Sequence, residues 1–461
     1  MNSNTFNSIL GLSLGIAVTG VSLLLGAEFE ALQIVFLPIA LLLAIALVGR
    51  PEYCAYFLIV FSFLDGFSEK FFGILPVSPY KVFTIFAFSS ILINSHKLRR
   101  HIECLLKTPT FLLFFSFFLC FIVSLVLSEN RSNAIDWGSR LFGIMLLFPI
   151  VSICLYKKEF VEIGIMLLAV SSGISGVVLV LDMILGTSLI STTEAATTAR
   201  TAEGINRSSG GSQSNPTTAA TMLITGAFVS IILVLEKHKN WRFFSVIAAI
   251  SIIAVAASLA RSASLVLIFL LFVVFLFYAR RSYSSSIVVI LACFAFLLSP
   301  LVPIEYFERL VSIFSGGDWT LGRRLTYHIV GVDLLLSNPV FGIGPGNFYE
   351  FFLLSEYRFL PGRTLGGRQL HNMYLSVFVE YGLVGGLAFV AFLASAFRVI
   401  VCSYALSINA LSSKFLVALI FSFTAFYLSS AFVPNEYNKY TWLLPALAIS
   451  YADANKRKPM V

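Results

Sequence analysis

Long apolar stretches recur along this 461-residue chain and are separated by short polar segments. A helix that crosses a bilayer needs roughly 20 mostly apolar residues, because each residue advances about 1.5 Å along the axis. The pattern predicts fourteen such helices, and because the third, fourth and last are short, twelve or thirteen spans also fit. The candidate stretches are 8–25, 32–49, 52–66, 81–95, 110–127, 141–156, 160–186, 217–235, 242–260, 262–279, 285–302, 372–397, 414–433 and 440–452.

The composition agrees with a chain that lipid solvates. Hydrophobic residues make up 58% of the chain, charged residues only 12%, and the mean hydropathy is +0.92, whereas soluble domains carry about 25% charged residues. The first residues lack the basic region and small-residue cleavage site of a secretory signal, so we expect a first span there. The six cysteines lie in apolar stretches or predicted inner loops, which argues against a disulfide framework and a thiol metal site.

Basic residues predict the orientation, because they concentrate in short cytoplasmic loops. With fourteen spans, the short basic loops and both termini fall on one side, which we take as cytoplasmic. The fold class expected is all-α, a polytopic transmembrane helix bundle of about 12–14 spans with a large, partly helical periplasmic loop. We divide it into N-terminal helices (1–186), core helices with a first outer loop at 187–216 (187–302), the large outer loop (303–371) and C-terminal helices (372–461).

The two outer loops hold most of the candidate polar residues. The first contains Arg200, Arg207 and Asn215, and the second contains six arginines. Within the second loop, RRLTYHIVGVDLLLSNP has apolar residues near helical spacing and then a proline, which predicts a helix lying on the membrane. Arginine binds phosphate oxygens bidentately, so an arginine-rich outer face suits a diphosphate ligand. The alternative is ordinary snorkelling and pairing with carboxylates.

The sharpest local pattern is HNMYLSVFVEYGLVGG, which starts a span with His371 and Asn372. At about 100° per residue on a continuous helix, Gly382 and Gly385 share the face of His371, so we expect that face to be buried in the bundle. Glu380 falls on the opposite face, where a carboxylate is costly unless paired, and we expect a structural role for it. For His371 itself, a general base and a capping or interfacial histidine both remain open.

The segment FGIGPGNF contains Gly342, Gly344 and Gly346. Glycine-rich turns can bind phosphates through backbone N–H groups, but a tight structural turn is the alternative. Neither a preceding strand nor a closing Lys-Ser/Thr is present, which excludes a Rossmann or Walker loop. The histidines show no metal-ligand spacing, so no metal and no cofactor are expected.

Arginines supply the remaining candidates. Arg261 lies in SLARSAS between two apolar stretches, and an arginine at that depth is a functional candidate. Arg200, Arg323 and Arg324 lie in water-accessible loops, where surface pairing is the simpler explanation.

Four of these patterns together resemble the O-antigen ligase and O-antigen polymerase superfamily of bacterial membrane glycosyltransferases. They are His371-Asn372 followed by Gly382 and Gly385, Arg200 followed after ten intervening residues by Gly211, Ser258-x-x-Arg261, and the stretch from Gly322-Arg323 through Asn338-Pro339 to Gly346-Asn347-Phe348. The likeness covers about 200–400. Tyr327 stands where the family usually has Trp, and Asn215-Pro216 fits the family's Asn-Pro element approximately.

The resemblance implies a glycan donor linked to undecaprenyl diphosphate, a glycan or lipid acceptor, and metal-independent, inverting transfer at the periplasmic face of the inner membrane. On that reading His371 accepts the proton of the acceptor hydroxyl, or holds that hydroxyl against the anomeric carbon, and Asn372 orients the histidine. Arg261, Arg200 and Arg323 bind the diphosphate or glycan, with Arg324 as the substitute for Arg323. Besides membrane lipid, a chain-length regulator is a candidate partner, and nucleic acid is not expected.

Three functions stay open at this point. A polymerase joins one lipid-linked glycan to another, and we favour it slightly because the second loop is long and rich in arginine. A ligase moves the finished chain to lipid A-core or another acceptor. A lipid-linked glycan transporter (flippase) is the alternative from another class, although transporters usually show internal repeats and charges near the bilayer midplane.

Overall fold

The computed structural model describes residues 49–64, 79–185, 215–279, 319–357, 359–360, 369–406 and 413–456, and every regular element there is a helix. The expected all-α helix bundle is confirmed. The longer helices are α3 (Pro51–Phe63), α5 (Pro79–Ile93), α6 (Ser95–Leu106), α7 (Pro109–Leu127), α8 (Arg131–Met145), α9 (Leu147–Cys154), α10 (Lys158–Leu185), α12 (Pro216–Leu235), α13 (Trp241–Ala257), α14 (Arg261–Ala279), α17 (Trp319–Ser337), α19 (Met373–Leu406), α20 (Ser413–Ser429) and α21 (Tyr440–Lys456).

Eleven of the fourteen predicted spans fall on described residues, apart from positions 65, 66 and 186 at their ends, and helices cover most of each of them. The stretches 8–25, 32–49 and 285–302 lie outside the described residues, apart from position 49. By length and composition, six described helices can cross a membrane: α7, α8 with α9, α10, α12, α14 and α19. Helices α3, α5, α13 and α20 are apolar but shorter.

Helix α12 lies at the centre of the bundle, and nearly all of its side chains are buried. It begins at Pro216, a residue that suits the first helical turn because its missing N–H has no partner there. Small residues let neighbouring helices approach: a Cβ on Gly226 would collide with Ser172 of α10. The Ser172 hydroxyl donates to the Leu223 carbonyl at 3.1 Å, which ties α10 to α12.

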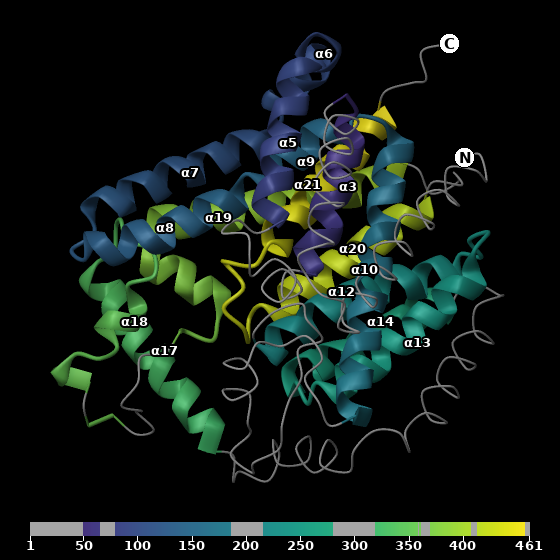
Figure 1. Ribbon diagram of the computed structural model, residues 1–461. Helices are drawn as coiled ribbons and strands as arrows, with labels where there is room; N and C mark the ends of the chain where they lie inside the picture. Colours follow the sequence, from purple (N-terminus) through teal and green to yellow (C-terminus); the bar gives the residue numbers. More distant parts are fainter. Residues whose placement is uncertain are drawn as a thin grey trace, which may run out of the picture.

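The buried apolar side chains of the described residues form two hydrophobic clusters. The larger cluster joins the helices of the bundle. The smaller cluster holds Tyr327, Val330 and Leu334 of α17 together with Phe348 and with Val379 of α19. Figure 1 shows α17 near the short helix α18 (Phe348–Phe351) at the lower left, below the ends of α7 and α8.

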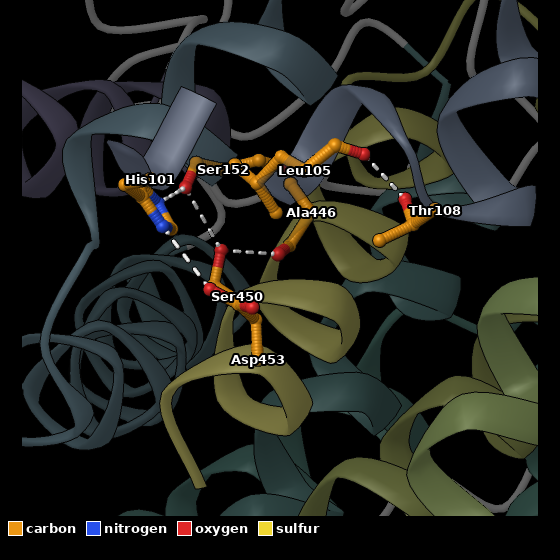
Figure 2. Close-up of polar contacts among 7 residues, drawn as sticks. All are labelled: His101, Leu105, Thr108, Ser152, Ala446, Ser450 and Asp453. Atoms are coloured by element: carbon orange, nitrogen blue, oxygen red, sulfur yellow. Dashed lines mark hydrogen bonds and ion pairs between the residues drawn. The ribbon is translucent and has the colours of Figure 1, made fainter. Parts of the chain in front are cut away.

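The basic segment HKLRRHIECLLK (96–107) lies between two predicted spans and was expected as one of the short inner loops, but it is helical. It forms the amphipathic helix α6, whose buried residues Leu98, His101 and Leu105 recur at helical spacing. In Figure 2 the His101 ring lies between two acceptors: Nε2 is 3.0 Å from the Ser152 carbonyl and Nδ1 is 3.1 Å from an Asp453 carboxylate oxygen. These contacts fasten α6 to α9 and α21.

Candidate functional site

A break in α19 organises the site. Gly382 has φ 69° and ψ −174°, a conformation essentially restricted to glycine, so the helix is interrupted there. The segment 339–347, here called the glycine turn, fills the interruption. Ile343 N–H donates to Val379 O (3.0 Å), Gly344 N–H donates to Glu380 O (3.0 Å), and Leu383 N–H donates to Pro339 O (2.7 Å).

The break corrects the helical-wheel argument, since that argument assumed one continuous helix from His371 to Gly385. Gly382 and Gly385 are buried, as expected. Gly385, however, lies beyond the break, where its nearest neighbour outside α19 is Cys120 of α7. The spacing of 100° per residue therefore cannot be carried across the break, and it does not place His371 and Gly385 on one face.

The three glycines of the turn all have positive φ: 71° at Gly342, 94° at Gly344 and 72° at Gly346. Their N–H groups are already engaged, by the Asn338 carbonyl, by the Glu380 carbonyl and by the Glu380 carboxylate respectively. These three N–H groups are therefore not available to a phosphate. The geometry favours the tight-turn alternative over the phosphate cradle.

Asn347 fixes the turn to the junction of α7 and α8. Its side chain is fully buried, and its Nδ2 donates to Ser128 Oγ (2.6 Å) and to Ile343 O (2.9 Å). Its Oδ1 accepts a hydrogen bond from Asn133 Nδ2 at 2.8 Å. Gly346 packs on Trp137 so closely that a Cβ would collide with the indole.

Glu380 is buried and paired, as expected for a structural carboxylate. The Tyr437 hydroxyl donates to its Oε2 at 2.9 Å. One turn earlier on α19, Ser376 donates to Glu436 Oε1 at 2.7 Å. Glu436 lies between α20 and α21, and burial together with the neighbouring Glu380 raises its pKa.

His371 lies just before the first turn of α19 and is half-buried. Its ring packs against Tyr327 of α17, with 5.8 Å between the ring centroids. Asn372 is the capping residue, because its Oδ1 accepts from the N–H groups of Tyr374 (3.0 Å) and Leu375 (3.1 Å). The capping role therefore belongs to Asn372, and that oxygen is committed to the helix.

Arg261 is the first residue of α14 and is half-buried. It follows a tight turn in which Leu259 has φ 54° and the Ser258 hydroxyl accepts from Ala260 N–H at 3.3 Å. At the other end of α14, the Tyr278 hydroxyl donates to Glu236 at 2.6 Å, and Glu236 ends α12. Helices α12 and α14 therefore run parallel, with Arg261 toward the Pro216 end.

Helix α20 brings His371 to that same end. Its Phe415 ring lies 6.0 Å from the ring of His238, which follows α12, while Ser422 donates to Thr225 midway along α12. Helix α20 is thus antiparallel to α12, and its last turn lies toward Pro216. Because Ser430 O accepts from Met373 N–H at 2.9 Å, His371 and Arg261 share what we call the His371 end of the bundle.

The other predicted residues are placed unevenly. Asn215 caps α12, since its Oδ1 accepts from Thr217 N–H at 2.9 Å. Arg324 is half-buried on α17. Arg323 belongs to α17, but its side chain lies outside the described residues, as do Arg200 and Arg207 entirely. Within the described part of the chain, no three His, Cys, Asp or Glu residues are grouped as they are in a metal site.

Residues 246–390 match the family model described as O-antigen ligase. The match confirms the resemblance to the O-antigen ligase and polymerase superfamily. It supports a ligase or polymerase type of activity, with lipid-linked glycan and acceptor substrates in general. No curated protein matches the chain.

The segment that matches the superfamily contains the break and the glycine turn as well as Arg261, Arg324 and His371. Arg200, Arg207 and Asn215 precede it. The centre of the described site thus coincides with the segment that matches the family model.

His328 is a residue that the sequence did not single out. Its Nε2 is buried without a hydrogen-bond partner among the described residues. Burial, and next to it the positive charge of Arg324, lowers its pKa. A neutral imidazole one residue beyond Tyr327 is therefore a second candidate base in this superfamily site. The one sequence feature that could have pointed to His328 is that it and His371 are the two histidines on the predicted outer side.

Proposed function

We propose that this protein transfers a glycan from undecaprenyl diphosphate to an acceptor hydroxyl at the periplasmic face of a bacterial inner membrane, as a polymerase of lipid-linked glycans. The observation that carries the proposal is the arrangement at the His371 end. There a histidine packed on α17 and an arginine at the start of α14 share one end of the bundle, and both lie within the family match.

The reaction requires three things of this end of the bundle. A base must accept the acceptor's hydroxyl proton, and an imidazole with a pKa near 6.5 suits neutral pH. The acceptor oxygen attacks the anomeric carbon from the side opposite the diphosphate, which inverts that carbon. The diphosphate leaves with its negative charge, which guanidinium groups can stabilise in place of a metal ion. We assign the base to His371 and the diphosphate contacts to Arg261 and Arg323 or Arg324.

Asn372 takes a narrower role than the sequence suggested. Since its Oδ1 caps α19, it fixes where the helix begins and so the position of His371. Asn215 contributes in the same way at the start of α12.

The test uses the purified protein with a synthetic lipid-linked repeat unit as the only substrate. A ladder of products with release of undecaprenyl diphosphate supports the polymerase. Product that forms only when a second acceptor is supplied supports the ligase, which is the second candidate because the family model itself carries that description. If no diphosphate is released under either condition, transfer is refuted and the transporter becomes the better explanation.

Variants test the assigned base. His371→Ala should abolish transfer, whereas His96→Ala, an exposed histidine on α6, should leave it unchanged. Full activity of a folded His371→Ala protein would contradict the assignment, and loss of activity in His328→Ala instead would move the role to His328.

A further inference from the structure

Helix α17 has two apolar faces on opposite sides. Tyr327, Val330 and Leu334 pack into the smaller hydrophobic cluster. On the other side, Leu325, Ile329, Val332 and Leu336 are exposed by 61%, 47%, 46% and 73%. At about 100° per residue these four side chains fall within about 60° of arc, roughly opposite the buried face. We call them the α17 stripe.

The flanks of the stripe are polar. On the same helical projection, Arg324 and His328 lie on one side, with the half-buried Leu335 between them, and Asp333 and Ser337 lie on the other. The Asp333 carboxylate accepts from the Tyr357 hydroxyl at 2.7 Å. An aliphatic strip between two polar edges is the pattern of a helix that lies in a bilayer surface, where long basic side chains reach the headgroups.

The stripe also continues onto the surface of a membrane-spanning helix. Val340 and Phe341 follow α17 and are 50% and 37% exposed. The hydrogen bond from Leu383 N–H to Pro339 O (2.7 Å) holds this segment against α19. Directly beyond the contact, α19 exposes Leu383, Val384 and Leu387. One apolar surface therefore runs from a candidate span onto α17.

The residue types favour lipid over a protein partner. The centres of protein interfaces are enriched in aromatic residues, Met and Arg. The α17 stripe contains only leucine, isoleucine and valine, as does the exposed part of α19 that it joins.

We propose that α17 lies in the plane of the membrane surface at the His371 end, with the α17 stripe in the hydrocarbon boundary of the bilayer. Tyr327, on the opposite face, packs against His371. The depth of α17 in the lipid therefore sets the height of His371 relative to the lipid phosphates.

Site-directed spin labelling in lipid nanodiscs tests this directly. Single nitroxides are placed at Ile329, Val332 and Leu336 in a chain whose native cysteines are replaced. Leu387 serves as the lipid-facing reference and Ser337 as the exposed polar control on the same helix. Collision rates are measured with oxygen, which concentrates in hydrocarbon, and with a water-soluble nickel chelate.

At the stripe, the ratio of oxygen to nickel collisions should match that at Leu387 and be several-fold higher than at Ser337. A ratio like that of Ser337 would mean that the stripe faces water and would overturn the proposal. Shielding from both reagents would mean that protein covers the stripe, and would overturn it as well. A label that prevents folding is moved to Val340, on the same exposed surface. The readout does not depend on catalysis, so it stands or falls separately from the proposed transfer.

Discussion

Replacing Gly382 with alanine should destabilise the protein more than any other single methyl addition in α19. The added Cβ would meet the backbone of Val340 and Phe341 in the glycine turn, so neither side can yield by rotating a side chain. The φ of 69° with ψ of −174° costs a non-glycine residue on the order of 1–3 kcal/mol. Displacing the turn also breaks three backbone hydrogen bonds, each worth about 0.5–1.5 kcal/mol. The sum is roughly 2.5–7.5 kcal/mol, which is a large fraction of the total stability of about 5–15 kcal/mol typical of a folded protein.

Thermal unfolding in detergent, followed by near-UV circular dichroism, measures the effect. The matched control is Gly143→Ala, in the interior of α8, where the new Cβ meets no described atom within 4 Å. Alanine there should be neutral or stabilise by up to about 1 kcal/mol, because glycine is the weaker helix former. If Gly382→Ala unfolds at the same temperature as Gly143→Ala and wild type, α19 is continuous in the native protein and the docking of the turn is wrong.

Three further predictions concern Asn347 in the glycine turn, His238 after α12 and Arg261 at the start of α14. Asn347→Ala removes three buried hydrogen bonds that hold the glycine turn, so it should lower the free energy of unfolding by about 2–4 kcal/mol. It should also lower transfer activity. Equal unfolding midpoints for the variant and the wild type would contradict this prediction. Burial lowers the pKa of His238 to about 4, with Lys414 and Lys239 adding to the shift, so its contribution to stability is fully present above pH 6.5 and is lost as the pH falls from 6.5 toward 4. That loss is on the order of 3 kcal/mol, and His238→Gln should show a flatter dependence of the unfolding midpoint on pH; parallel curves would refute the assignment. Arg261→Lys should retain more transfer activity than Arg261→Gln, because it keeps the charge while losing the bidentate geometry, and equal activity in both variants would argue against a diphosphate contact.

The helical class and most of the spans follow from the sequence, and the reason is local. In lipid, every backbone N–H and C=O must find a partner within the chain, so an apolar stretch of sufficient length forms a helix whatever its neighbours do. That holds for α10 and α12, whose bounds differ from the predicted ones by one or two residues. The prediction failed locally at α6, because the basic segment between two spans was taken as a loop although Leu98, His101 and Leu105 recur at helical spacing.

The sequence also singled out the correct glycines but not their arrangement. Gly342, Gly344 and Gly346 were marked by the FGIGPGNF segment and Gly382 by its spacing from His371, and each has a positive φ in the structure. No local pattern shows that Gly382 interrupts a helix, since it lies within a long, mostly apolar stretch that contains no proline. The interruption exists because a segment some 40 residues earlier in the chain supplies the hydrogen bonds that the broken helix lacks.

The sequence by itself determined that this chain is a membrane helix bundle, that its polar chemistry gathers in a few segments, and which superfamily it resembles. Only the tertiary structure decided that Asn372 caps while His371 packs on Tyr327, that the glycine turn is closed by its own contacts, and that Arg261 shares an end with His371. The physical reason is the range of the interactions. Lipid solvation acts on each stretch of chain separately, whereas caps, breaks and convergent side chains depend on contacts between residues that are far apart in sequence.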